Sequence, residues 1–144
     1  KDYKKVDPQI LDDIFKKEVR PKIVGPTLVI DYPEPVMQLA KLKEDDRGLT
    51  ESFQLIANGV EIVKGFSELN DPVFQRRQME MQEKEFRAGR EEASRFDEDF
   101  IEALEYGMPP AAGLGLGIDR LAALVTKSHA VKEIIAFPTL RPKA

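Results

Sequence analysis

The stretch Gly113-Leu-Gly-Leu-Gly-Ile-Asp-Arg120-Leu121 is the part of this 144-residue chain that decides its fold. A glycine at every second position removes the side chains from one face of a strand, so that a flat ligand can lie against the backbone. Arg120 follows at the start of an apolar helix and places a positive charge beside that bare face. The third glycine comes one residue too early for the dinucleotide fingerprint, and no Gly-Lys-Ser/Thr follows, so the spacing excludes two common phosphate-binding loops.

A β-hairpin is predicted upstream, with strands over 52–57 and 60–66. Asn58-Gly59 between them supplies both positive-φ residues of a type I′ turn. This turn fixes the register and places Ile56 opposite Glu61. Because cross-strand partners share a face, a regular ladder predicts two sets of side chains. Gln54, Ile56, Glu61 and Val63 would point one way, and Leu55, Ile62 and Lys64 the other.

Several helices are indicated by their start and stop signals. Asp7-Pro8 begins a half-buried helix of about three turns that ends before Pro21. Asp71-Pro72 begins a long helix that ends near Ala88-Gly89, and a short one runs from Asp97 to Gly107. On the long helix we expect ion pairs at i, i+4 spacing, namely Arg76 with Glu80, Glu80 with Lys84 and Glu83 with Arg87.

The remaining segments complete the outline. The run Thr27–Tyr32 reads as a buried strand, and residues 43–48 read as a charged loop. In the helix after Arg120, Leu121, Leu124 and Val125 are expected to pack inward. Hairpin strands separated by helices, rather than strict strand-helix alternation, predict an α+β fold with an antiparallel sheet flanked by helices.

Composition narrows the class of protein. Apolar residues make up 42% of the chain, the formal net charge is −4, and there is no cysteine, which excludes disulfides and thiolate metal sites. No apolar run of membrane-spanning length and no leader are found, so we expect a soluble, cytoplasmic protein without membrane contact. Because the chain begins with Lys1, we expect it to be a piece of something longer.

Carboxylates, arginine and backbone are the groups left for chemistry, since His129 is the only histidine. This inventory suits phosphoryl or nucleotidyl transfer, in which Mg²⁺ and protein groups position reactants and neutralise charge. Each candidate also has a plain structural interpretation: Glu61 as an exposed strand carboxylate, Glu68 as a helix-dipole partner, Arg120 as a salt-bridge residue. Their occurrence together beside a bare strand favours a site.

Three segments carry a resemblance to a known family: Phe66-Ser-Glu-Leu-Asn-Asp-Pro72, Ala103-Leu-Glu-Tyr-Gly-Met-Pro-Pro110 and the glycine-arginine segment. Together they closely resemble the C-terminal part of the catalytic domain of class II lysyl-tRNA synthetases, over about Thr27 to Lys143. The glycine-arginine segment resembles the third signature motif of all class II enzymes. The first segment is similar to the lysine enzymes, within the subgroup that also holds the aspartyl and asparaginyl enzymes.

The resemblance implies a partial class II catalytic core for residues 1–144, without the N-terminal anticodon-binding domain and the first two signature motifs. It implies a catalytic pair, Arg120 and Glu61, and an ATP site formed by Arg120, Gly115, Gly117 and Glu61. It implies a lysine site formed by Glu68, Phe66, Lys64 and Gly113, with Glu68 facing the ammonium. Mg²⁺ is expected on Glu61 and Gln54, where it bridges the ATP phosphates.

Two positions depart from the family pattern. Gln54 stands where the family usually has a second Mg²⁺-binding glutamate, so the site loses a charge. Lys64 stands where many members have asparagine near the substrate; a lysine there either pairs with the substrate carboxylate or points away.

A regular strand cannot place both predicted carboxylates in one pocket. Glu61 and Glu68 are seven residues apart, which puts them on opposite faces. We therefore predict a bulge or bend at Lys64-Gly65.

The function implied by the resemblance is activation of lysine with ATP and its transfer to tRNA(Lys) by a full-length homodimeric enzyme, with this fragment inactive alone. Two alternatives stay open: a related ligase that lysylates a protein, and a non-catalytic synthetase-like binding module.

Overall fold

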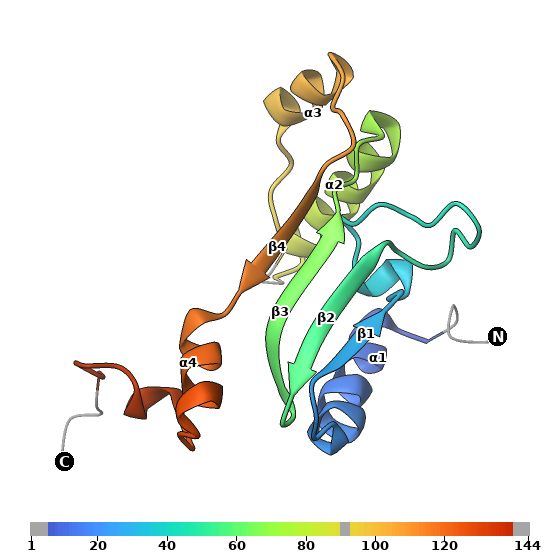
Figure 1. Cartoon of the computed structure of the whole chain (residues 1–144). Helices are drawn as coiled ribbons and strands as arrows, with labels where there is room; N and C mark the ends of the chain where they lie inside the picture. Colours follow the sequence, from blue (N-terminus) through green and yellow to red (C-terminus); the bar gives the residue numbers. More distant parts are fainter. Residues whose placement is uncertain (1–5, 90–92, 140–144) are drawn as a thin grey trace.

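The computed structural model describes residues 6–89 and 93–139 of the chain. Its centre is a four-stranded antiparallel sheet in the order β1-β2-β3-β4 (Figure 1). The strands are β1 (Thr27–Ile30), β2 (Ser52–Ala57), β3 (Val60–Ser67) and β4 (Ala112–Leu116). The expected α+β class, with an antiparallel sheet and flanking helices, is confirmed.

The helices lie around this sheet. They are α1 (Pro8–Ile14), α2 (Pro72–Arg87), α3 (Glu98–Glu105) and α4 (Ile118–Thr126), together with the short helical turns η2 (Phe15–Val19), η3 (Arg20–Lys22), η4 (Glu34–Val36) and η5 (Val131–Glu133). The helix α1 contacts the turn η4, while α4 follows directly from the end of β4 (Figure 1). None of the helices in the described ranges is both long and apolar enough to cross a membrane.

The hairpin forms at the predicted turn. Asn58 and Gly59 have φ angles of 50° and 72°, as a type I′ turn requires, and Ile56 pairs with Glu61 as expected. These two backbone conformations follow from the Asn-Gly pair itself, so the start of the β2–β3 ladder is set locally.

The register shifts by one residue just beyond this start. Leu55 pairs with Val63 rather than with Ile62, which makes Ile62 the extra residue of a β-bulge in β3. An irregularity between Glu61 and Glu68 was predicted, but its expected position at Lys64-Gly65 is wrong, because the ladder is regular from Val63 onward. The bulge also reverses two assignments: Val63 moves away from the face of Glu61, and Lys64 joins it.

Gly65 is required for packing rather than for a bend. A Cβ atom built at Gly65 would lie 2.7 Å from the Phe53 ring and 3.0 Å from the carbonyl oxygen of Gly113. Phe53 is the cross-strand partner of Gly65, so its ring covers the space that a side chain would fill. The glycine therefore allows β2, β3 and β4 to pack closely.

The core packs on the face of the sheet near β1 and β2. Tyr32, Met37 and Ala40 are buried there, with Phe15, Val29, Val36 and Phe66 packed against them. Phe15 and Tyr32 meet edge to face, with ring centroids 5.7 Å apart. This cluster attaches the N-terminal helical segment to the sheet.

Several apolar segments are less buried than their sequences predict. β1 is an edge strand rather than a buried one, with Leu28 and Ile30 each 61% exposed. The N-terminal helix, expected to be half-buried, changes to a π-helical turn after Ile14, and its apolar side chains Ile10, Ile14 and Val19 are exposed. Val125 of α4 is exposed as well. No part of the chain that the structure describes covers these side chains.

An ion pair joins α2 to α3. Asp71 caps α2 as expected, and Glu83 binds Arg87 at 2.8 Å. Arg76, however, binds Glu98 through two hydrogen bonds of 3.0 and 2.6 Å instead of pairing with Glu80. These hydrogen bonds hold the pKa of Glu98 below its usual value. Periodicity within one helix could not reveal this partner on another helix.

We expect Gly65→Ala to lower the free energy of unfolding by about 1–3 kcal/mol, because its methyl group would overlap the Phe53 ring. Gly25→Ala is the matched control, since a Cβ atom there meets nothing within 4 Å. Urea unfolding midpoints of the two variants test the prediction. Equal midpoints would show that the β2–β3 packing is not as described.

Candidate active site

A cleft of about 1010 Å³ opens over the face of the sheet that carries Glu61. Its floor includes Gln54, Glu61, Lys64 and Phe66, and Arg120 lies at its border. Its walls come from the start of the chain's first helix with η2 and η3, the segment 35–40, α2 and Ala93. Five of the predicted site residues therefore line one cavity.

The register of the strands explains this grouping. Lys64 lies between Gln54 on β2 and Gly115 on β4, and Phe66 lies opposite Gly113. Cross-strand partners point to the same face. Since the bulge at Ile62 shifts the alternation by one residue, Glu61, Lys64 and Phe66 share this face with the glycines.

The three glycines of the strand-helix segment meet different surroundings. A Cβ atom at Gly113 would lie 2.7 Å from Oε1 of Glu68, and one at Gly117 would lie 3.3 Å from the side chain of Arg120. At Gly115 the nearest atom is the carbonyl oxygen of Lys64, at 4.0 Å. Gly113 and Gly117 thus make room for the side chains of Glu68 and Arg120, while Gly115 leaves this face of β4 bare.

The other four predicted site residues, Glu68, Gly113, Gly115 and Gly117, are not among the residues that line the cleft. Glu68 lies beyond Phe66 on the same face of the sheet. Its side chain is half-buried and rests over Gly113, as the 2.7 Å approach indicates. Its backbone N–H donates to the carbonyl of Ala111, and it forms an isolated bridge with Ala40. The carboxylate is therefore held on the same side of the sheet as Phe66.

Arg120 and Glu61 meet at the other end. Nη1 of Arg120 donates to the backbone carbonyl of Glu61 at 2.9 Å and lies 3.6 Å from Oε1 of the same residue. The helix α4 that carries Arg120 begins two residues earlier than expected, at Ile118. Gly117 precedes it, and its N–H donates to the carbonyl of Ile62 at 2.9 Å. The bulge and the strand-helix junction are thus bonded directly to each other.

Several buried polar atoms in and near the cleft have no hydrogen-bond partner. Among the described residues they include Oε1 of Gln54, Nε of Arg20 and the hydroxyl of Tyr32. Burial raises the pKa of Tyr32 well above its usual value, and the carboxylates of Glu61 and Asp12 raise it further. An orphaned buried polar atom is costly unless a ligand or water meets it.

Sequence reasoning missed Arg20 and Tyr32. Arg20 was read only as the end of a helix before Pro21, and Tyr32 as the end of a strand. The signal at Tyr32 was its place in Asp31-Tyr-Pro33, just after the edge strand β1 ends.

Oxygen donors for a metal ion are few on this face. Glu61 offers a carboxylate and Gln54 an amide oxygen that is buried and unpartnered. No cluster of three or more His, Cys, Asp or Glu side chains suited to a metal ion occurs within residues 6–89 and 93–139. This donor set fits a Mg²⁺ ion whose remaining ligands are phosphate oxygens and water, which is how proteins commonly hold it.

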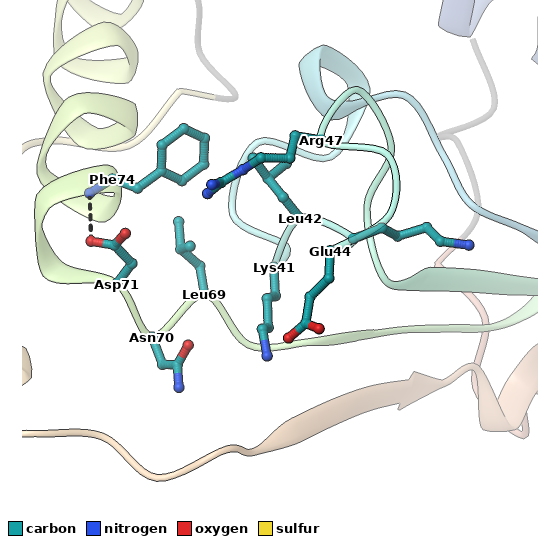
Figure 2. Close-up of a pocket in the computed structure, with 9 residues that line it drawn as sticks. Lys41, Leu42, Glu44, Arg47, Leu69, Asn70, Asp71 and Phe74 are labelled. Atoms are coloured by element: carbon teal, nitrogen blue, oxygen red, sulfur yellow. Dashed lines mark hydrogen bonds between the residues drawn. The ribbon is translucent and has the colours of Figure 1, made fainter.

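A second, smaller cavity of about 350 Å³ lies at the start of α2. Figure 2 shows its lining side chains, with Asp71 accepting a hydrogen bond from the backbone of Phe74 at 3.1 Å. The lining residues are Lys41, Leu42, Lys43, Glu44, Arg47, Leu69, Asn70, Asp71 and Phe74. None of the predicted site residues is among them, whereas five line the larger cleft.

Comparison with known proteins places the chain. Residues 4–141 match the sequence model of a family described as tRNA synthetases class II (D, K and N). The chain is 47% identical over 135 residues to the lysine–tRNA ligase of Moorella thermoacetica, 48% over 134 residues to that of Pelotomaculum thermopropionicum, and 49% over 136 residues to that of Gloeobacter violaceus. These alignments cover 94%, 93% and 94% of this chain but only 28%, 26% and 27% of the relatives, so the chain spans about a quarter of their length. The chain belongs to the class II tRNA synthetases of the D, K and N group.

Proposed function

We propose that this chain is the C-terminal portion of a class II catalytic domain whose full-length protein activates lysine with ATP and transfers it to tRNA(Lys). The observation that carries the proposal is the charge order along one face of the sheet, with the Glu68 carboxylate at one end and Arg120 with Glu61 at the other. The match to lysine–tRNA ligases over nearly the whole chain supports it.

The Glu68 end suits the amino acid. A cation that leaves water needs a hydrogen-bonded counter-charge, and the Glu68 carboxylate over Gly113 provides one for the substrate's side-chain ammonium. Phe66 lies next to it on the floor and offers an apolar surface for the methylene groups. A carboxylate at this point also disfavours acidic and neutral amino acids, which would leave it unpaired.

The Arg120 end suits the nucleotide. One of the five guanidinium N–H groups is used on the Glu61 carbonyl, which orients the side chain and leaves other donors for phosphate oxygens. The open floor at Gly115 gives the flat ligand a surface without side chains. Groups fixed in this way stabilise the charge that develops during transfer without having to rearrange.

Glu61 and Gln54 would hold the Mg²⁺ that accompanies ATP. A bound Mg²⁺ neutralises phosphate charge and orients the triphosphate. Glu61 lies so close to Arg120 that the Mg²⁺ on Glu61 and the Arg120 guanidinium would contact neighbouring phosphate oxygens.

The remaining parts of the proposal concern the longer protein. We infer a cytoplasmic homodimer whose acceptor is tRNA(Lys), with the 144 residues alone inactive because an anticodon-binding domain and further ATP ligands are supplied elsewhere. An anticodon-binding domain in the full gene would distinguish transfer of lysine to tRNA from transfer of lysine to a protein.

The test is lysine-dependent exchange of pyrophosphate into ATP by the full-length protein. We expect exchange with the full-length protein and none with residues 1–144 alone. Glu68→Gln should raise the KM for lysine at least tenfold, about 1.4 kcal/mol, with little change in the KM for ATP, because only the ammonium loses its counter-charge. Absence of exchange in the full-length protein would contradict the proposal and favour a non-catalytic binding module.

Gly113→Ala should weaken the binding of lysine selectively. Its methyl group would occupy the position of Oε1 of Glu68 and displace the carboxylate. We expect a rise of about tenfold in the lysine KM, equivalent to about 1.4 kcal/mol, while Gly25→Ala, which meets nothing, leaves it unchanged. An unchanged lysine KM in Gly113→Ala would argue against the assigned place of Glu68.

A further inference from the structure

Lys64 brings a positive charge onto the floor of the cleft. It lines the cleft, is exposed, and lies between Gln54 and Gly115 in the sheet. It forms no ion pair or hydrogen bond with a side chain in the described ranges 6–89 and 93–139. Since Gly115 has no side chain, the ammonium stands beside open floor.

The position of Lys64 along β3 lies between the two ends of the proposed site. Glu68 is four residues farther along the strand, a Cα separation of about 13 Å. Glu61, bonded to Arg120, lies on the other side of Lys64, beyond the bulge at Ile62. On the proposed function, on which this inference rests, Lys64 stands where the carboxylate of the amino acid meets the α-phosphate of ATP.

Two anions must approach each other at that point, and positive charge is needed there. The metal donors of this face are one carboxylate, Glu61, and one amide oxygen, that of Gln54, which is buried and unpartnered. A hard cation such as Mg²⁺ needs oxygen ligands, and this set suffices for one ion completed by phosphates. Lys64 lies directly opposite Gln54 on the neighbouring strand, and its ammonium repels a further cation.

We propose that the Lys64 ammonium contacts the α-phosphate and the attacking carboxylate, and supplies the positive charge that a second divalent cation would otherwise bring. One divalent ion per site then suffices. In the step itself, a carboxylate oxygen of lysine forms a bond to the α-phosphorus, the bond from that phosphorus to the bridging oxygen breaks, and pyrophosphate leaves with the electron pair. Lys64 keeps its proton throughout and acts by charge alone.

Nucleotide binding to the full-length protein tests the contact. The probe is α,β-methylene-ATP, which cannot be cleaved, titrated by calorimetry with lysine present and Mg²⁺ at saturation. Lys64→Met should raise the Kd at least tenfold, whereas Lys64→Arg, which keeps the charge, should stay within threefold of the parent. A Kd for Lys64→Met within threefold of the parent would overturn the inference.

Counting bound divalent ions tests whether Lys64 takes the place of a second metal ion. With Mn²⁺ as the spectroscopic probe and the same analogue bound, we expect one Mn²⁺ per site in the parent protein. Combining Gln54→Glu with Lys64→Met restores a second carboxylate and removes the repulsion, so two Mn²⁺ per site are expected. Two or more ions in the parent protein would overturn the inference.

Different results would contradict the proposed function and the role of Lys64. If lysine-dependent pyrophosphate exchange is absent, the proposed function fails and this inference with it. If exchange is present but the parent binds two ions, or Lys64→Met binds the analogue normally, the inference alone fails.

Discussion

One extra residue in β3, Ile62, is the constraint on which the rest of the structure depends. Without the bulge, Lys64, Phe66 and Glu68 would point away from the face that carries Glu61. The bulge is held from β4 and α4, because Gly117 donates to the carbonyl of Ile62 and Arg120 to that of Glu61. The hairpin and the glycine-arginine segment, which are far apart in the sequence, therefore fix each other's geometry.

This arrangement produces a cleft whose charges are ordered before any ligand arrives. Backbone hydrogen bonds orient Arg120, and a missing Cβ at Gly113 admits the Glu68 carboxylate. Orientation by backbone rather than by flexible side-chain partners suits a reaction in which the protein stabilises charge and forms no covalent bond. Among the described residues, the orphaned oxygen of Gln54 and the ammonium of Lys64, which forms no ion pair there, are available to ligands.

Features set by local chemistry were predictable from the sequence. The Asn58-Gly59 turn, the Asp71 cap of α2 and the bare face of β4 each depend on a few neighbouring residues, and all appear as expected. The need for an irregularity between Glu61 and Glu68 was predictable from period-two alternation. Its position was not, because Gly65 carried a stronger local signal than Ile62, although its actual role is to accommodate Phe53. Burial of β1 and of the N-terminal helix was overestimated, since exposure depends on what covers an element rather than on its own pattern.

The register of β2 against β3 is the most direct test of this account. It can be read from cross-strand nuclear Overhauser effects between backbone protons in a labelled sample of the protein. The account predicts that Gln54 lies opposite Lys64, and Leu55 opposite Val63. Contacts of Gln54 with Val63, and of Leu55 with Ile62, would show an unbulged ladder and would contradict the shared face of Glu61, Lys64 and Glu68.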